Sequence, residues 1–515
     1  MYHCKQTGQF LHKDHLLKLT TSNYCNEAIL NASGTIFAVC SGFGKCGVSV
    51  VRISGTQASL VLKKIGQMRK LPKPRTAVYR RLVNPDLKEP IDRGLVMWFP
   101  GPASFTGEDT VEFHVHGGPA VITALLTALG TIPDLRHAQP GEFTKRSFMN
   151  GKLDLTEVEG LADLIHAETE SQRIQALRQL EGDLHHLYGD WRTRLLKCTA
   201  NVNAYIDFSE DDNIEEDILD IVNREVQSLM NEIKAHLSDN RRGERLRDGV
   251  QVAILGKPNV GKSSLLNAIT QRPAAIVSPV PGTTRDVVDI SLNLGGYPVL
   301  LSDTAGLRET PDAVEQEGVR RAVSRAGKSD VQVIVLEAQI FASQQRSLKE
   351  IIHIHFQELG ISLTQNNEET TEGADCSDKV VQGSDVVVVL NKCDLIELDT
   401  LQKPIEDIDG IRVCILSCLT GEGMEKFLNI LTEKVKDMCG SPSAGSPSLT
   451  QVRHRTHLTQ CLHHMVLYGE RTRGGDIVLA AQSLRRALGE LGRIMGHVTS
   501  EDILDVIFRD FCIGK

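Results

Sequence analysis

Short apolar runs separated by turns dominate the first part of the chain after Ser33. Runs rich in β-branched and aromatic residues occupy positions 35–40, 48–53, 95–99 and 110–115, and segments that carry Gly or Pro lie between them. Such runs predict strands, because these side chains fit a pleated surface and Gly and Pro mark turns. The pattern predicts an α+β domain over residues 34–153.

The middle and the end of the chain have helical periodicity. Over residues 154–247 Gly and Pro are almost absent and apolar side chains recur every three or four residues. Residues 450–511 show the same spacing without Pro. Spacing of this kind predicts amphipathic helices. We expect residues 154–248 and 441–515 to pack together as one helical domain with the intervening segment inserted between them.

The inserted segment has a different pattern. Residues 249–440 alternate β-rich runs with helical stretches, which is typical of a mostly parallel sheet with crossover helices. The predicted fold class is therefore multidomain α/β and α+β. Residues 361–385 are polar, and from Gln365 to Asp385 six acids stand against one Lys, which predicts a solvated, disordered insertion. Residues 440–448 have the composition of a linker.

The composition is that of a soluble protein with several domains. The chain has 515 residues, 41% of them hydrophobic, and 57 Lys+Arg against 66 Asp+Glu give a formal net charge of −9. At roughly 100–200 residues per domain this length suggests about three domains, and no apolar run reaches the ~18–20 residues that span a bilayer. The 12 cysteines form no C-x-x-C pair. We therefore expect a reducing compartment and neither a zinc ribbon nor a disulfide framework.

Two segments carry an unusual local charge. Residues 63–81 hold eight cations and no acid, which indicates either a solvated basic face or a local RNA contact. The acidic total excludes a general coating for nucleic acid. Residues 1–33 carry Lys5, Lys13 and Lys18 against two acids and no Arg, which fits either a cleaved transit peptide or a frayed tail.

A phosphate-binding sequence opens the inserted segment. Gly256-Lys-Pro-Asn-Val-Gly-Lys262-Ser263 matches G-x-x-x-x-G-K-S and lies between a strand-like run and a helix-like run. The glycines allow backbone N–H groups to surround a β-phosphate, and the helix N-terminus adds its dipole. Lys262 would neutralise β- and γ-phosphate oxygens, and the Ser263 hydroxyl would bind Mg²⁺.

Four further elements follow in the order that a guanine-nucleotide-binding domain requires: a G-T-T-R-D loop, D-T-A-G, N-K-C-D and a strand ending at Ser417. The carboxylate of Asp394 can accept both N1–H and the exocyclic N2–H₂ of guanine, a donor pair that adenine lacks. The sequence therefore predicts a Ras-like P-loop GTPase domain over residues 249–440. Its predicted nucleotide ligands are Asn259, Val260, Gly261, Lys262, Ser263, Ser264, Ser278, Thr283, Thr284, Asp303, Thr304, Ala305, Gly306, Asn391, Lys392, Asp394, Ser417, Cys418 and Leu419, with Ser263 and Thr284 assigned to Mg²⁺.

The group that drives hydrolysis must differ from that of Ras-like enzymes. Those enzymes orient the attacking water with a Gln directly after D-x-x-G, and Leu307 occupies that position here. Asn259 and the segment 278–283 together offer oxygen ligands for a monovalent cation near the β/γ bridge. The alternative for Asn259 is a side chain that only closes its own loop.

The combined motifs resemble one known family. With G-K-P-N-V-G-K-S-S-L-L-N-A, A-I-V-S-P-V-P-G-T-T-R-D, D-T-A-G-L-R-E-T and a terminal F-C-I-G-K, the chain resembles the MnmE/TrmE family of tRNA modification GTPases, in its animal mitochondrial form, from Thr35 to Lys515. The resemblance implies an N-terminal folate-binding domain that forms a homodimer, a helical domain and an inserted GTPase domain. It implies activation by potassium-dependent pairing of GTPase domains, with Glu315 as the water-orienting catalytic residue. The implied potassium ligands are Asn259, Ser278, Val280 and Thr283.

The resemblance also implies a folate site. A 5-formyl- or 5,10-methylenetetrahydrofolate ligand would bind at Arg52, Glu112, Lys152 and Lys515, where a carboxylate suits the pterin N–H donors and cations suit the folate carboxylates. His114 and His116 share a strand face, but without a third ligand they are better explained as ordinary strand histidines than as a metal pair. Cys512 is either a nucleophile or a buried small side chain.

The implied activity is a GTPase reaction coupled to tRNA modification. With an FAD-containing MnmG-like partner, the protein would install a 5-taurinomethyl or 5-carboxymethylaminomethyl group on wobble uridine of tRNA in the mitochondrial matrix. Folate would supply the carbon, and taurine or glycine the amine. A regulatory or ribosome-assembly GTPase is the alternative. A one-carbon transferase acting alone is disfavoured, because the chain shows no flavin fingerprint.

Overall fold

The computed structural model divides the chain into two compact units, residues 1–162 with 496–515 and residues 163–495. The described residues are 34–42, 44–208, 217–271, 289–303, 329–340, 348–358, 361–364, 379–382, 385–396, 408, 410–440, 447–497, 504, 507–509, 511 and 514.

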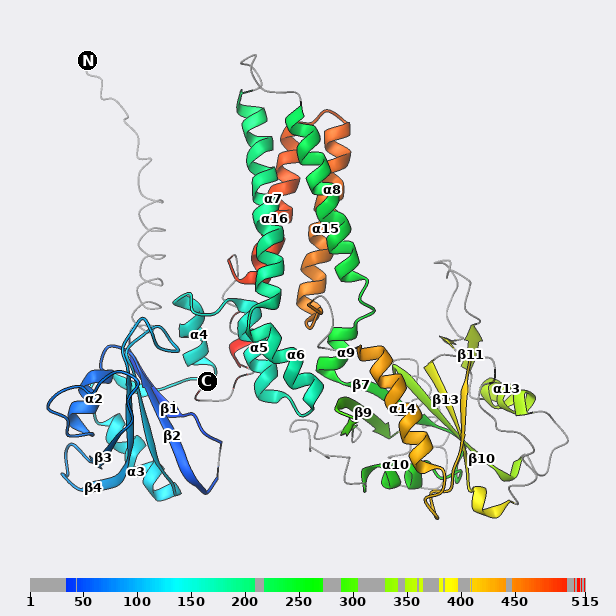
Figure 1. Ribbon diagram of the computed structural model, residues 1–515, viewed down its shortest axis with the longest axis horizontal. Coiled ribbons are helices and arrows are strands. Elements are labelled where there is room, and N and C mark those ends of the chain that lie inside the picture. The colour runs from blue at the N-terminus through cyan, green and yellow to red at the C-terminus, as the bar shows by residue number, and fades with distance from the viewer. Residues whose placement is uncertain are drawn as a thin grey trace, which may run out of the picture. The chain divides into compact units, whose positions relative to one another are not determined.

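The first unit contains a six-stranded sheet in the order β3-β4-β5-β2-β1-β6, antiparallel except for the β1/β6 pair (Figure 1). All four runs predicted as strands are strands. The sequence pattern missed β3, where exposed charged residues interrupt the apolar run, and β6, which is three residues long. The strands are β1 (Thr35–Val39), β2 (Cys46–Ser54), β3 (Val78–Val83), β4 (Pro90–Phe99), β5 (Thr110–Gly117) and β6 (Leu135–His137).

Helices cover both faces of this sheet. On one face, α2 (Ala58–Lys64) and α3 (Pro119–Gly130) pack against alternate strand residues and form the main core of the unit. On the other face, Phe143 of α4 (Glu142–Met149) packs with Ile36 and Ala38 of β1. The remaining part of this second face carries polar side chains of β2 and β5.

The end of the chain packs into the first compact unit. The helical domain expected from residues 154–248 and 441–515 stays a prediction, while residues 154–162 and 496–515 cluster with the N-terminal sheet. The reason is an apolar cluster between α5 (Leu155–His166) and the chain end, made of Leu155, Val158, Leu504, Phe508 and Phe511. Helical periodicity identified the helices, but it could not identify their packing partners.

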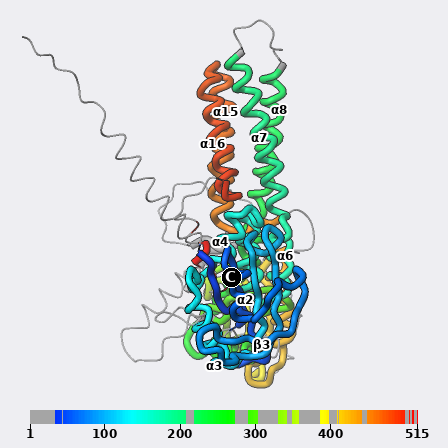
Figure 2. The backbone as a smooth tube through the Cα atoms, turned by 90° about the vertical axis from the view of Figure 1, so that its left-hand side faces the viewer, coloured from blue at the N-terminus to red at the C-terminus, as the bar shows by residue number. Residues whose placement is uncertain are grey.

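The second unit contains a bundle of four long helices, α7 (Asp183–Phe208), α8 (Asp217–Leu237), α15 (Val452–Arg473) and α16 (Ile477–Met495), which lie side by side in both views (Figures 1 and 2). Their buried apolar side chains form one core. Two segments far apart in the sequence thus build a single bundle. The shorter helix α6 (Glu170–Leu180) precedes the bundle in sequence, and α9 (Arg242–Asp248) lies in sequence between α8 and the α/β part.

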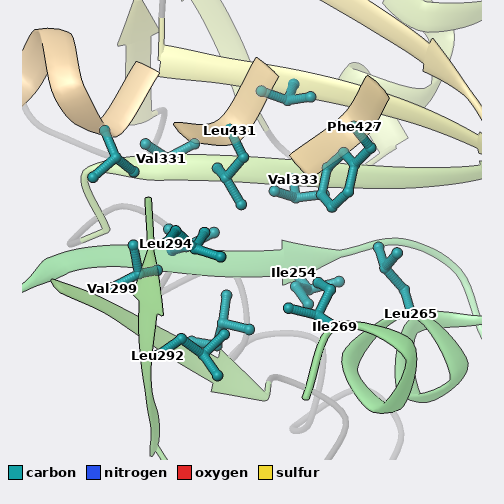
Figure 3. Close-up of a cluster of buried hydrophobic side chains, with 14 of the residues drawn as sticks. Ile254, Leu265, Ile269, Leu292, Leu294, Val299, Val331, Val333, Phe427 and Leu431 are labelled. Atoms are coloured by element: carbon teal, nitrogen blue, oxygen red, sulfur yellow. The ribbon is translucent and has the colours of Figure 1, made fainter. Parts of the chain in front are cut away.

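The α/β part has a six-stranded sheet in the order β14-β13-β10-β7-β9-β8, parallel except for the β8/β9 hairpin. Alternate residues of each strand enter two cores: α10 (Lys262–Thr270) and α14 (Met424–Cys439) cover one face (Figure 3), and α13 (Leu348–Glu358) covers the other. This is the predicted α/β architecture. Its strands are β7 (Val250–Leu255), β8 (Asp289–Leu294), β9 (Tyr297–Asp303), β10 (Val331–Glu337), β13 (Val386–Asn391) and β14 (Arg412–Ile415).

The acidic insertion has more regular structure at its two ends than predicted. β11 (Ile361–Thr364) and β12 (Lys379–Gln382) pair in parallel as a two-stranded sheet. Both segments carry branched apolar residues, which favour strands, whereas the acids that dominated the prediction lie mostly between them, outside the described residues. No described helix combines the length and apolar content that crossing a bilayer requires.

Candidate functional site

The phosphate-binding loop joins β7 to α10 through three residues with left-handed backbone angles. Gly256, Asn259 and Gly261 have φ of 152°, 65° and 101°. A Cβ at Gly256 would lie 2.4 Å from the carbonyl oxygen of Val335, and one at Gly261 would lie 2.1 Å from the amide nitrogen of Asn391. Both positions therefore require glycine, for backbone conformation and for space.

Lys262 begins α10 and points its ammonium back over the loop. Its Nζ donates to the carbonyl oxygens of Gly256 and Lys257, both at 2.8 Å. Ser263 and Ser264 follow in the exposed first turn of the helix. A cation, two hydroxyls and the free N–H groups of a helix N-terminus thus share one end of α10, which suits a polyphosphate.

Asn391 connects the phosphate-binding loop to the loop after β14. This side chain is 2% exposed. Its Nδ2 donates to the carbonyl oxygen of Val260 at 2.8 Å, and its Oδ1 accepts from the backbone N–H of Cys418 at 3.1 Å. One buried amide therefore fixes the distance between the segment predicted for phosphates and the segment predicted for the base.

The predicted base-recognition carboxylate is held by a buried serine. Ser417 Oγ donates to Oδ1 of Asp394 at 2.5 Å and accepts from the backbone N–H groups of Leu419 and Thr420. Burial raises the pKa of the Cys418 thiol to about 11, so this neighbour stays neutral. Asp394 is thus oriented without a positive charge, and its carboxylate remains available to N–H donors.

Glu337 is a site residue that the sequence analysis missed. Lys392 adopts φ of 65°, and its Nζ donates to Oε1 of Glu337, with side-chain exposures of 34% and 29%. Glu337 ends β10 in register with Asn391 at the end of β13. An acid at the carboxyl end of a buried parallel strand was the available signal, since ligand-binding residues gather at that edge.

Of the remaining predicted nucleotide residues, the structure describes the backbone of Asp303, and the others lie outside the described residues. Asp303 ends β9 in register with Ile254 of β7, next to the strand that leads into the phosphate-binding loop. The nucleotide and cation roles of these other residues stay predictions. The predicted residues outside the described ranges are Ser278, Val280, Thr283, Thr284, Thr304, Ala305, Gly306 and Glu315.

In the first unit, two predicted folate ligands contact each other across neighbouring strands. Arg52 of β2 and Glu112 of β5 are register partners, and Arg52 Nε donates to Glu112 Oε1 at 2.9 Å. Their side chains are 15% and 16% exposed. The Arg52 guanidinium lies 5.1 Å from the ring centroid of Phe105 and 5.6 Å from that of Phe143. The ion pair thus lies beside two aromatic rings.

Two buried polar atoms at this pair have no hydrogen-bond partner among the residues that the structure describes. They are Nη1 of Arg52 and Nε2 of His114, and the latter lies 3.6 Å from Glu112 Oε2. Because an unpaired buried donor costs free energy, such atoms are expected where a ligand completes the site. The donor set fits a ligand with both acceptor oxygens and N–H donors. His114 was predicted only as an ordinary strand residue.

Two other predicted folate residues lie elsewhere or outside the described residues. Lys152 is exposed, and within the described residues no hydrogen bond or ion pair joins its side chain to Arg52 or Glu112. Lys515 and Cys512 are outside the described residues. Their neighbour Gly514 lies against the end of β1, where Cys40 Sγ donates to its carbonyl oxygen at 2.8 Å. The terminal segment therefore reaches the N-terminal sheet.

The structure gives no support to a metal pair on β5. His116 Nδ1 lies 2.9 Å from Asp92 Oδ1, whereas His114 lies near Glu112. Among the described residues, no group of three or more His, Cys, Asp or Glu side chains is arranged to hold a metal ion.

One glycine spacing qualifies the expectation that the chain has no flavin fingerprint. Gly42, Gly44 and Gly47 match G-x-G-x-x-G. Gly42 and Gly44 lie between the antiparallel strands β1 and β2, and Gly47 lies at the start of β2. The fingerprint requires a strand followed by a helix whose N-terminus holds the pyrophosphate, so this segment lacks the necessary context.

Comparisons with known proteins match this arrangement over nearly the whole chain. The family model "MnmE helical domain" matches residues 155–512, and "GTP-binding protein TrmE N-terminus" matches residues 35–152. The mitochondrial 5-taurinomethyluridine-tRNA synthase subunit GTPB3 of Danio rerio is 52% identical over 485 residues, covering 93% of each chain. Its Homo sapiens counterpart is 49% identical over 498 residues, 97% of this chain and 96% of that one.

A bacterial protein extends the similarity beyond mitochondria. The tRNA modification GTPase MnmE of Parvibaculum lavamentivorans is 46% identical over 482 residues, which cover 93% of this chain and 100% of that one. Full-length similarity at these identities, together with two matching family models, shows that this chain belongs to the MnmE/TrmE family of tRNA modification GTPases.

Proposed function

We propose that this chain is the GTP-hydrolysing component of a mitochondrial tRNA modification enzyme that forms a 5-taurinomethyl or 5-carboxymethylaminomethyl group on wobble uridine. The relatives that carry the name 5-taurinomethyluridine-tRNA synthase subunit match 93–97% of this chain. The observation that carries the proposal is the presence in one chain of a guanine-nucleotide site and of the incomplete Arg52–Glu112 site. A pure switch protein has no need of the second.

The nucleotide site would hold GTP with the phosphates at the start of α10 and the base at Asp394. Ser263 and Thr284 would hold Mg²⁺, and Asn259, Ser278, Val280 and Thr283 would hold K⁺. Hydroxyl, amide and carbonyl oxygens are the ligands that such hard cations prefer. Bound cations neutralise charge on the transferred phosphoryl group. Glu315 would orient the attacking water, a role that rests on its place in the family pattern.

The folate site would hold 5-formyl- or 5,10-methylenetetrahydrofolate at Arg52 and Glu112, with Lys152 and Lys515 as further ligands. The unpaired Nη1 of Arg52 supports this, because a guanidinium N–H readily donates to a ligand oxygen. Glu112 could accept from adjacent pterin N–H groups, as Asp394 would from guanine. Phe105 and Phe143 would exclude water from one side of the ion pair.

Two further components complete the proposal. An FAD-containing MnmG-like partner would carry the redox chemistry, since this chain lacks a flavin-binding turn in its proper context. The protein would act as a homodimer through its N-terminal domain, in the mitochondrial matrix. Mitochondrial residence is supported by the names of the GTPB3 relatives.

Mass spectrometry of mitochondrial tRNA nucleosides tests the proposal. Cells that lack this chain should lose the C5 modification of wobble uridine, and the unaltered chain should restore it. A Lys262→Ala chain, which lacks the phosphate-binding cation, should not. Unchanged nucleosides together with defective ribosome assembly would instead favour a regulatory GTPase.

A further inference from the structure

Four cations surround one open pocket of the first unit, whose lining residues include none of the candidate folate residues. The pocket has a volume of about 470 Å³, and Lys63, Lys64, Arg69 and Lys88 line it with Asp86 as the one acid among its lining residues. Lys88 lies outside the basic stretch 63–81 that the sequence singled out. The fold therefore adds a cation to that stretch and gives the cluster a concave shape.

The pocket is built from well-packed elements. Lys63 and Lys64 occupy the last turn of α2, and Lys88 lies in the turn between β3 and β4. A backbone hydrogen bond of 3.0 Å from Val83 to Ile65 joins this turn to the segment after α2. The buried side chain of Ile132 lies at its floor. The cations are thus carried on a supported surface.

These cations are not neutralised within the protein. Among the described residues, no carboxylate lies within ion-pair distance of Lys63, Lys64 or Arg69, and Lys88 Nζ donates to the carbonyl oxygen of Pro85. Cations at a helix C-terminus are favoured by the helix dipole, which accounts for two lysines. It accounts for neither Arg69 nor Lys88.

Further exposed cations lie close to the pocket residues in sequence. Lys70, Lys73, Arg80 and Arg81 are all exposed. The chain as a whole has a net charge of −9, so this concentration of positive charge runs against the composition. Repulsion among like charges is unfavourable unless an anion relieves it.

We propose that this surface, the Lys63–Lys88 pocket, binds the phosphate backbone of the RNA substrate. A concave site lined by Lys and Arg suits the regularly spaced phosphates of an RNA backbone. Contacts to the backbone position an RNA without reading its sequence. The inference rests on the proposed function, which supplies tRNA as the substrate. It assigns the tRNA contact to a surface distinct from the two ligand sites.

The salt dependence of tRNA binding to the full-length protein tests this assignment. The variant Lys63→Gln/Lys64→Gln/Arg69→Gln removes three exposed charges. Its Kd for a mitochondrial tRNA transcript should rise at least about tenfold at 100 mM KCl, because fewer phosphate contacts form and fewer counterions are released on binding. The slope of log Kd against log salt should fall by about 2 to 3 for the same reason. GTP hydrolysis without tRNA should stay unchanged.

A matched variant controls for total charge. Lys234→Gln/Lys426→Gln/Lys436→Gln removes three exposed lysines of the second unit, and it should bind tRNA as the unaltered protein does. Equal weakening by both triple variants, or by neither, would overturn the assigned surface while leaving tRNA as substrate. Binding of anionic lipid vesicles in preference to tRNA would also overturn it. An unaltered protein that hydrolyses GTP but binds no tRNA would overturn the proposed function as well.

Discussion

Asp394 uses one carboxylate oxygen to fix its position. Ser417 Oγ donates to Oδ1, and within the described residues this is the one hydrogen bond that the carboxylate accepts. A neutral, buried hydroxyl is a suitable partner, because a cation there would compete with the N–H donors of a base. The motif alone identified Asp394, whereas the role of Ser417 as its support follows from the structure.

Asp394→Asn should therefore change the base that the site prefers. An amide offers a donor where guanine also presents a donor, and it matches the carbonyl of xanthine instead. Loss of one such pair costs roughly 1–3 kcal/mol, so GTP affinity should fall about 10- to 100-fold while XTP affinity rises. Competition binding with GTP, XTP and ATP measures this. Unaltered preference for guanine would remove Asp394 from the base site.

Glu337 should act on nucleotide affinity through Lys392. The ion pair holds a lysine whose backbone is in the left-handed region, and the pair is partly exposed, so its loss should cost about 0.5–1 kcal/mol. Glu337→Gln should raise the dissociation rate of GDP about two- to fivefold with little change in kcat. The control Glu433→Gln breaks the exposed pair with Arg412 on the same domain. If both variants release GDP equally, Glu337 has no specific role.

At the scale of elements, α6 contacts the β8/β9 hairpin, which lies in sequence between the two segments predicted to carry the switch residues. The N–H of Ser171 donates to the carbonyl oxygen of Gly296 at the tip of the β8/β9 hairpin, and Ser291 Oγ donates to Glu168 at 3.0 Å. Thr169 and Gln172 form a capping box that fixes the start of α6. Residues 272–288 and 304–328, which carry most of the predicted switch residues, flank this hairpin in sequence.

The histidine at the base of the bundle should make its stability depend on pH. His236 lies edge-on to Tyr188 and Trp191, and burial lowers its pKa from 6.5 to about 4. The folded state binds this proton less readily than the unfolded state. Stability is therefore complete above pH 6.5 and decreases as the pH falls from 6.5 toward 4, by up to about 3 kcal/mol.

Urea unfolding followed between pH 7.5 and 4.5 measures this loss. His236→Gln removes the titrating group, so its stability should depend less on pH over this range than that of the unaltered chain. The exposed His463 of α15 offers the control His463→Gln, which should keep the full dependence. Equal slopes for all three proteins would show that other groups, not His236, cause the acid sensitivity.

Local patterns predicted elements well and long-range contacts poorly. Alternation and turn residues were enough for β1, β2, β4 and β5, because each is a run rich in apolar residues bounded by turn residues. The Asn391 amide that joins Val260 and Cys418, by contrast, depends on β10 lying between β7 and β13, an order that no local pattern contains. The same holds for Lys392 and Glu337. Motifs therefore identified site residues, while strand order identified their partners.

At the scale of the whole molecule, the two proposed ligand sites are made of residues from separate compact units, so they should respond independently to mutation. Arg52→Ala should weaken 5-formyltetrahydrofolate binding about tenfold or more, because it leaves the Glu112 carboxylate without its partner. GTP affinity should stay unchanged. Calorimetry with each ligand measures both, and Arg52→Lys, which keeps the charge, checks that the effect is not misfolding. An unaltered protein that binds no folate would defeat the assignment.

The complete reaction would join a folate-derived one-carbon unit and an amine to C5 of uridine. Because the G-x-G-x-x-G match leads from one antiparallel strand into another and not into a helix, we expect the flavin to come from a second protein. Alone, the chain should hydrolyse GTP, faster in K⁺ than in Na⁺, and leave uridine unmodified. With an FAD-containing MnmG-like protein, tRNA, methylenetetrahydrofolate, taurine or glycine, GTP and K⁺, it should yield C5-modified wobble uridine.

Glu315→Ala separates hydrolysis from binding in that reconstituted system. A water-orienting residue acts mainly on the transition state, so this variant should bind GTP and folate normally, hydrolyse GTP at least about 100-fold more slowly and form no modified uridine. The product is lost because closure of the GTPase domains, which we expect hydrolysis to drive, would gate the chemistry. Nucleoside mass spectrometry gives the readout. Full modification by Glu315→Ala would mean that hydrolysis is uncoupled from the chemistry and would favour a regulatory role for the GTPase domain.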